Sequence, residues 1–153
     1  MSTELSDYLE QNAVMLSNDV QGELINGIIA NLPHMGIQGQ YKPHPEVRLF
    51  REDRIVGSAD LVVEAVNELY IIEATIRYSS MEDTSTRRTA IRKLNKQLRR
   101  DFDFFSGRFS VKARKFGVIR YGNPTEFYFY ELDADSSCRR VEPIRVAAYT
   151  TQG

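Results

Sequence analysis

Cysteine and histidine are scarce in this sequence, which has one cysteine, Cys138, and two histidines among 153 residues. A single thiol excludes an internal disulfide and any zinc site that needs several cysteines. No apolar run reaches the roughly 18 residues of a membrane-spanning helix, and the N-terminus lacks the basic and then apolar order of a signal peptide. These absences predict a cytoplasmic, intracellular protein that does not enter a membrane.

Internal repeats, low-complexity tracts and recognisable linkers are also missing. Hydrophobic residues make up 42% of the chain and charged residues 27%, which is typical of a soluble globular protein. A chain of 153 residues is long enough to bury one core. We therefore expect a single domain over residues 1–153.

Acidic residues are absent between Asp83 and Asp101, where the spacing of apolar residues predicts a long amphipathic helix with Thr84 or Ser85 as its N-cap. The opposite side of this helix is basic. Residues 87–120 hold twelve basic and two acidic side chains, although the formal net charge of the whole chain is -1. The apolar stripe consists of Ile91, Leu94, Leu98, Phe102 and Phe105.

Two interpretations of this basic helix stay open. Charge runs are usually a solvated helix face, but such a face mixes both signs in pairs one turn apart, and this one does not. The local excess of positive charge favours binding to nucleic-acid phosphates, with an affinity that falls as salt rises. The candidate DNA-binding residues are Arg87, Arg88, Arg92, Lys96, Arg99 and Arg100.

Two short runs of β-branched, aromatic and aliphatic residues, 61–63 and 69–72, predict a β-hairpin. Without a bulge, this hairpin sets Asp60 opposite Glu73. Both strands are apolar on both faces, which is typical of central strands. Two carboxylates at facing positions lie about 5 Å apart and repel each other, so we expect a cation between them. Mg²⁺, or Mn²⁺ in its place, suits this position because Mg²⁺ binds through one or two carboxylates and substrate phosphate oxygens.

The segments Gly57–Val63 and Ile72–Thr75, joined by this hairpin, resemble the PD-(D/E)XK nuclease superfamily, with RecB-like exonucleases and archaeal Holliday-junction resolvases closest in pattern. The resemblance extends over about residues 20–130 and leaves residues 133–153 as a C-terminal extension. It implies a restriction-endonuclease-like α/β fold, in which an N-terminal helix and the long basic helix flank a central mixed β-sheet. It also implies Mg²⁺-dependent hydrolysis of DNA, and a homodimer, since small members of the superfamily often pair.

By this resemblance, Asp60 and Glu73 are the metal-binding acids and the carbonyl of Ala74 is a third ligand. The catalytic lysine of the superfamily corresponds to Thr75, whose hydroxyl carries no charge. Another cation would then have to stabilise the phosphate as it gains negative charge. Arg77 is one candidate, because side-chain alternation places it on the same strand face as Glu73 and Thr75.

The long helix offers a second candidate cation, Lys93, since some branches of the superfamily carry their lysine on this helix. Gln97, one turn later, resembles the glutamine of a RecB-like signature and is followed by Leu98. Lys93 and Gln97 lie at the edge of the apolar stripe and would point toward the strand ends. A solvent-facing lysine and a glutamine at the edge of the core are the alternative interpretations.

The N-terminal region, from about Glu4 to Leu32, has a helical pattern with Asn18 or Ser17 as an N-cap. Glu23 lies beside the apolar face of this helix, and in the superfamily an acidic residue of the first helix often completes the metal shell. Solvated glutamates are also common on helices, so both interpretations of Glu23 stay open.

Further strands are expected at residues 46–50, 115–121 and 126–132, with an edge segment at 141–149. The aromatic residues of the strand at 126–132 fit core packing better than stacking on unpaired bases. His34 and His44 flank a proline-containing loop, and we expect them to be loop residues rather than metal ligands.

The leading hypothesis is a metal-dependent nuclease that hydrolyses phosphodiester bonds in DNA. The alternative is a nuclease-derived module that binds nucleic acid, or scaffolds a complex, without cutting, and Thr75 supports it. A third interpretation is a protein-interaction domain whose acids and arginines pair internally. Duplex, branched and single-stranded DNA, and RNA, all stay open as substrates.

Overall fold

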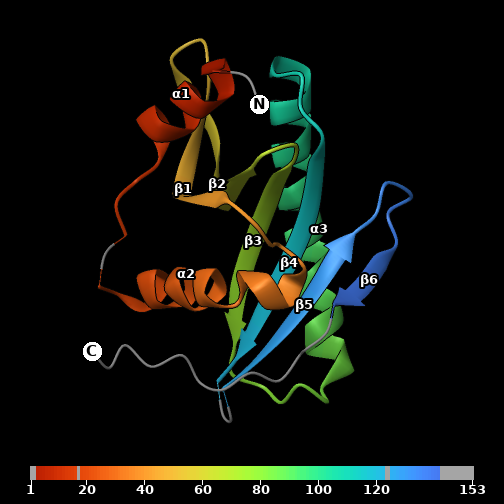
Figure 1. The fold of residues 1–153 in the computed structure, drawn as a ribbon. Coiled ribbons are helices and arrows are strands. Elements are labelled where there is room, and N and C mark those ends of the chain that lie inside the picture. Colours follow the sequence, from red (N-terminus) through yellow and green to blue (C-terminus); the bar gives the residue numbers. More distant parts are fainter. Residues whose placement is uncertain (1–2, 17, 123–124, 142–153) are drawn as a thin grey trace.

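The computed structural model describes residues 3–16, 18–122 and 125–141, which fold around a six-stranded mixed β-sheet (Figure 1). The helices are α1 (Thr3–Asn12), α2 (Val20–Ala30), the short 3-10 helix η1 (Leu32–Met35) and α3 (Thr84–Arg108). The strands are β1 (Tyr41–Arg51), β2 (Arg54–Ala65), β3 (Leu69–Arg77), β4 (Ala113–Tyr121), β5 (Glu126–Leu132) and β6 (Cys138–Val141). This arrangement confirms the α/β class.

The strands lie in the sheet in chain order, from β1 at one edge to β6 at the other. Only the pairing of β3 with β4 is parallel among the described strands. A parallel pair needs a long crossover connection, and α3 provides it. The long basic helix is therefore the element that connects the two halves of the sheet.

The predicted β2–β3 hairpin is present in the expected register, with Leu61 opposite Ile72 and Val62 opposite Ile71. Pairing ends at Leu61 and Ile72, so β2 separates from β3 at Asp60 and Glu73. Strand β3 continues to pair with β4 beyond this point. The separation leaves room at the side of β3 for polar side chains.

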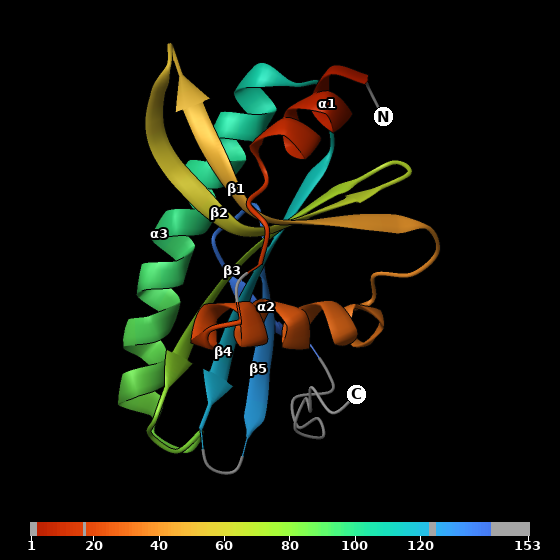
Figure 2. The same cartoon turned by 90° about the vertical axis from the view of Figure 1, so that its left-hand side faces the viewer.

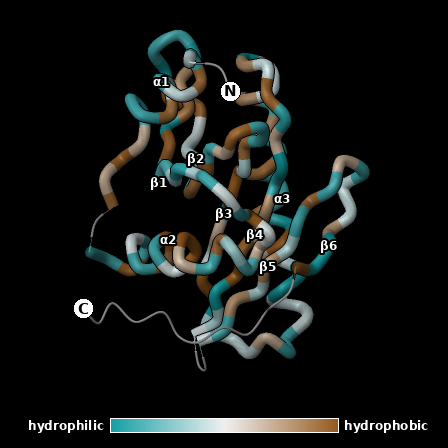
Figure 3. Tube along the Cα trace, in the orientation of Figure 1, coloured by the Kyte–Doolittle hydropathy of each residue, from teal (hydrophilic) through white to brown (hydrophobic). Residues whose placement is uncertain are grey.

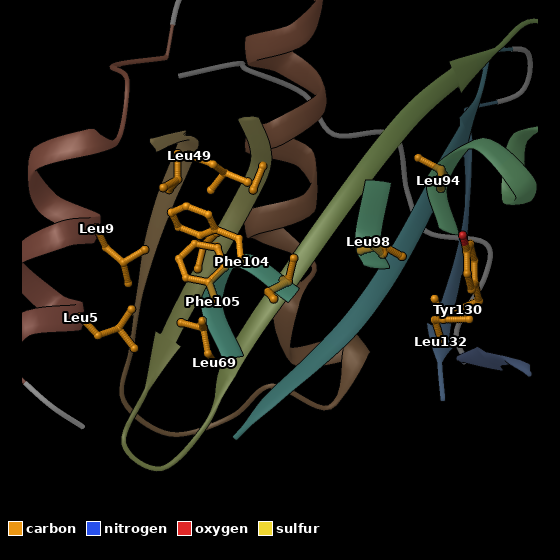
Figure 4. Packing of buried hydrophobic residues seen from close by; sticks show 14 of the residues in the cluster. Leu5, Leu9, Leu49, Leu69, Leu94, Leu98, Phe104, Phe105, Tyr130 and Leu132 are labelled. Atoms are coloured by element: carbon orange, nitrogen blue, oxygen red, sulfur yellow. The ribbon is translucent and has the colours of Figure 1, made fainter. Parts of the chain in front are cut away.

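Each face of the sheet has its own core, and the two cores are covered by different helices. Helices α1 and α3 pack on one face, where Phe104 and Phe105 of α3 lie close to Leu9 of α1 (Figure 4). Helix α2 and η1 cover the other face through residues such as Ile25 and Leu32. Figure 2 shows α3 running along one side of the strands, and Figure 3 shows apolar segments both in the central strands and in α2.

The helix boundaries differ from those expected from the sequence pattern. The region from Glu4 to Leu32 forms two helices rather than one. Helix α2 is capped by Asp19, whose side chain accepts a hydrogen bond from the Gly22 N–H; Asn18 does not cap it, and Ser17 lies outside the described residues. Asparagine, aspartate and serine are about equally good N-caps, and the negative charge of Asp19 is also favourable beside the positive end of the helix dipole.

Helix α3 likewise begins after an aspartate, because Asp83 accepts a hydrogen bond from the Thr86 N–H at 3.1 Å. The predicted caps, Thr84 and Ser85, lie inside the first turn. Among the described residues, no helix combines the length and apolar character needed to span a membrane.

Strand β1 is longer than the expected segment 46–50 and includes the prolines at 43 and 45. Proline is tolerated there because β1 is an edge strand, where one side needs no hydrogen-bond donors. His44 is therefore buried in β1, with Nε2 3.1 Å from Oε1 of Glu64, whereas His34 is exposed in η1. Beyond Val141, the last residue of β6, the expected edge segment 141–149 lies outside the described residues.

Candidate functional site

Asp60 lies where β2 leaves β3, and its carboxylate occupies the space that the separation opens. Oδ2 accepts a hydrogen bond from the Ala74 N–H at 2.9 Å, and Oδ1 accepts a longer one from Nε2 of Gln21 on α2 at 3.4 Å. Burial raises the pKa of Asp60, while the Ala74 N–H and the positive charges of Arg100 and Lys93 oppose the rise. Asp60 therefore belongs to a partly dry, polar site.

Glu73 is 1% exposed and lies on the face of β3 that α3 covers. Its pKa is raised above the ordinary value, first by burial and then by the carboxyl groups of Asp101 and Asp60. Like charges close together in a buried site cannot all ionise. In the absence of a bound cation, Glu73 therefore holds a proton and can donate a hydrogen bond to Asp101.

Asp101 is the member of the site that sequence reasoning missed. It is fully buried on α3, and burial raises its pKa. It follows Leu94 and Leu98 on the buried stripe of the helix and precedes Phe105, at spacings of four, three and four residues. An aspartate inside an apolar stripe was the signal that could have identified it, because buried acids need partners. Asp60, Glu73 and Asp101 are called the acid group below.

Arg100 is the cation closest to the acid group. It donates to Oδ1 of Asp101 from Nε at 3.0 Å and from Nη2 at 2.8 Å, and to the Ser58 carbonyl at 2.9 Å. Its Nη2 also lies 3.6 Å from Oε2 of Glu73, beyond hydrogen-bond distance. Gly57 permits this approach, since a Cβ there would lie 2.8 Å from the guanidinium carbon. One arginine thus partly compensates three carboxyl groups.

The donor atoms of the acid group suit a hard divalent cation. Oε2 of Glu73 and Oδ2 of Asp101 are buried and accept no hydrogen bond from an N–H or hydroxyl group of the described residues, so the proton of Glu73 is the remaining donor between these two carboxyl groups. Carboxylate oxygens are the ligands that Mg²⁺ and Mn²⁺ prefer. Within residues 3–16, 18–122 and 125–141, however, no three histidine, cysteine or acidic side chains are already arranged to hold a metal ion. Cation binding would need loss of the Glu73 proton and a small rearrangement of the side chains.

Thr75 and Arg77 share a strand face, as predicted, because Nη1 of Arg77 donates to Oγ1 of Thr75 at 2.7 Å. The same Nη1 donates to the Ile76 carbonyl at 2.9 Å. Arg77 is therefore directed to its own strand, with its guanidinium at Thr75, which is two residues after Glu73. The Ala74 N–H is used by Asp60, and the role of the Ala74 carbonyl as a metal ligand stays a prediction.

Lys93, Gln97 and Arg100 follow one another at helical spacing on α3, so they form one stripe on its surface. The two ends of this stripe act on the acid group, since the charge of Lys93 reaches Asp60 and Arg100 contacts Asp101. Gln97 is half-buried between them. Lys93 itself is exposed on this stripe, and its role at the site stays a prediction.

Glu23 is not the residue of α2 that reaches the acid group. Gln21 contacts Asp60, whereas Glu23 is exposed and lines a separate cavity with Arg120. The sequence pattern could not distinguish Gln21 from Glu23, because the rotation of α2 about its axis decides which of the two side chains points toward Asp60.

The basic residues of α3 divide into two sets. Arg87 donates to the Met81 carbonyl and lies over the ring of Tyr128, and Arg100 is bound at the acid group. The remaining four candidates have exposed side chains and are available for phosphate contacts. They are Arg88, Arg92, Lys96 and Arg99.

Comparisons with known proteins give no further assignment: no family model matches the chain, and neither a curated protein nor a solved structure matches it.

Proposed function

We propose that this protein is a metal-dependent nuclease that hydrolyses DNA phosphodiester bonds, with the restriction-endonuclease-like fold of the PD-(D/E)XK superfamily. The observation that carries the proposal is the acid group, in which three carboxyl groups gather where β2 leaves β3 and two of their buried oxygens accept no hydrogen bond from an N–H or hydroxyl group of the described residues. Such a site is costly to the folded protein, because burying acidic groups without full compensation is destabilising. Sites of this kind, with several shifted pKa values, are typical of functional positions.

Asp60 and Glu73 are the residues that would hold Mg²⁺ or Mn²⁺. When bound, such an ion polarises a phosphoryl oxygen and lowers the pKa of a water molecule. Lys93 supplies positive charge on the side of Asp60, where it would attract and orient the scissile phosphate. The exposed basic residues of α3 would hold the flanking backbone phosphates through salt-sensitive contacts.

A second candidate function is DNA binding without cleavage. Arg100 already compensates part of the acid group, and Thr75 gives no charge at the position of the superfamily lysine. An arginine held at the metal position by Asp101 would compete with a divalent cation. The same basic face of α3 would still bind DNA.

A cleavage assay separates the two functions. Labelled duplex, junction, flap and single-stranded DNA would be incubated with Mg²⁺ or Mn²⁺ and with wild type, Asp60→Asn, Glu73→Gln or Asp103→Asn. Asp103 is an exposed acid of α3 outside the acid group, so its variant is the matched control. The nuclease proposal expects cutting by wild type and Asp103→Asn only.

The variant Thr75→Lys restores the superfamily residue and tests the binding-only alternative. If wild type and Thr75→Lys both bind DNA but neither nicks any of the substrates, DNA binding without cleavage replaces the nuclease proposal.

A further inference from the structure

A cavity of about 300 Å³ opens on the α2 side of the sheet. Its walls come from the first turn of α2, the end of β3 and the end of β4, which bring together segments far apart in the sequence. Its lining residues are Val20, Glu23, Ile76, Tyr78, Arg120 and Gly122.

Tyr78 gives this cavity an open aromatic surface. It is 84% exposed, and every other aromatic side chain in residues 3–16, 18–122 and 125–141 is buried or half-buried. Its ring lies on Gly122, where an added Cβ would be 3.2 Å from Cδ1. The ring is thus supported by backbone and is not covered by a described side chain, which leaves it free to stack on a planar ligand.

Glu23 and Arg120 supply the polar groups of the cavity. Neither side chain forms a hydrogen bond or ion pair with a residue that the structure describes. One offers a carboxylate acceptor and the other a guanidinium donor, beside an aromatic ring. A nucleobase presents a planar face together with donors and acceptors on its edges, so it matches all three groups.

The cavity lies close to Asp60 along α2. On α2, Val20 lines the cavity and the next residue, Gln21, contacts Asp60. On β3, Ile76 lies three residues after Glu73, so the two side chains are on opposite faces of the sheet, and the cavity is on the α2 face. A DNA strand with a phosphate at Asp60 could therefore place a nearby base in the cavity, through the side of the site that α2 borders.

We propose that this cavity binds an unpaired nucleobase of DNA, stacked on Tyr78 and hydrogen-bonded to Glu23 and Arg120. The inference rests on the proposed function and narrows its substrate to DNA with single-stranded bases. Paired bases are inaccessible inside a duplex unless they are flipped out. Single-stranded DNA is accordingly the preferred ligand, and Glu23 acts in base recognition rather than in metal binding.

The test is fluorescence anisotropy with a labelled oligodeoxycytidylate and a blunt duplex, in EDTA so that no cleavage occurs. Tyr78→Ala should weaken binding of the single strand by about 5- to 150-fold, the range found for losing one stacked base. Tyr78→Phe, which keeps the ring, should bind like wild type. Val66→Ala, at an exposed apolar residue of the β2–β3 turn, is the control and should also bind like wild type.

A second measurement tests the base itself. Oligodeoxythymidylate should bind more weakly than oligodeoxycytidylate, because thymine has no exocyclic amino group that could donate to Glu23. Glu23→Gln should reduce this difference in affinity between the two oligonucleotides. An unchanged affinity of Tyr78→Ala for single strands, or an equal loss for the duplex, would overturn the inference. If wild type cuts DNA while Tyr78→Ala binds normally, only this inference fails. If wild type binds no DNA at low salt, both it and the proposed function fail.

Discussion

Replacing Glu73 by glutamine should stabilise the metal-free protein at alkaline pH. Glutamine has nearly the shape of a protonated glutamate and keeps a donor for Asp101, but it cannot ionise. In the wild type, the buried Glu73 has a pKa raised above its ordinary value by burial and by the neighbouring acids. The folded state therefore retains a proton that the unfolded state releases as the pH rises above about 4.5.

The sign and size of the effect follow from this difference in bound protons. Stability that the proton contributes is present at acid pH and is lost as pH rises, at about 1.4 kcal/mol per pH unit for one proton. Between about pH 5 and pH 8 this amounts to at most roughly 4 kcal/mol. Asp60 and Asp101 have pKa values shifted in the same direction, so they add to the slope in both proteins.

The assay is urea unfolding followed by circular dichroism in EDTA, at several pH values across this range. Glu73→Gln should match the wild type near pH 5 and exceed its free energy of unfolding near pH 8 by about 1 to 4 kcal/mol. Asp103→Asn should follow the wild type throughout. If Glu73→Gln keeps the wild-type slope, or is less stable at every pH, then Glu73 does not carry the retained proton and the reasoning is wrong.

Three further predictions concern the residues around the acid group. Gly57→Ala should displace the Arg100 guanidinium and lower the free energy of unfolding by about 1–3 kcal/mol, because Asp101 loses its charged partner. Urea unfolding measures this change. If Gly57→Ala is as stable as the wild type, Arg100 can move without cost. The triple variant Arg92→Glu, Lys96→Glu and Arg99→Glu should weaken DNA binding and flatten its salt dependence. The control is Arg48→Glu, at an exposed residue of β1, which should bind DNA like the wild type. Unchanged affinity of the triple variant at low salt would favour a protein-interaction domain. Lys93→Ala should reduce cleavage by about 100-fold or more with little change in DNA affinity, and a larger loss in Arg77→Ala than in Lys93→Ala would move the catalytic charge to the strand.

Local pattern was sufficient to predict the elements that contain the candidate site. The pattern of the hairpin predicted the β2–β3 register, and the apolar stripe at residues 91–105 predicted a long helix with a basic face. Strand alternation also placed Thr75 and Arg77 on one face, as their hydrogen bond confirms. These features depend on residues close together in the sequence, so periodicity alone predicts them.

Features that depend on tertiary contacts were not predictable in this way. Asp101 joins the site only because α3 crosses over β3 and brings the acid against Glu73. The choice of Gln21 over Glu23 depends on how α2 is rotated on the sheet. The caps at Asp19 and Asp83 were missed because serine, threonine and asparagine stood nearby as equally good local candidates.

The most direct test of the central claim is a crystal of the protein soaked in Mn²⁺, with anomalous scattering measured for wild type and for Asp60→Asn. The proposed nuclease site predicts anomalous density between the carboxylates of Asp60 and Glu73 in the wild type, and none in the variant. Density elsewhere, or density that persists in Asp60→Asn, would contradict a metal site built by these two acids.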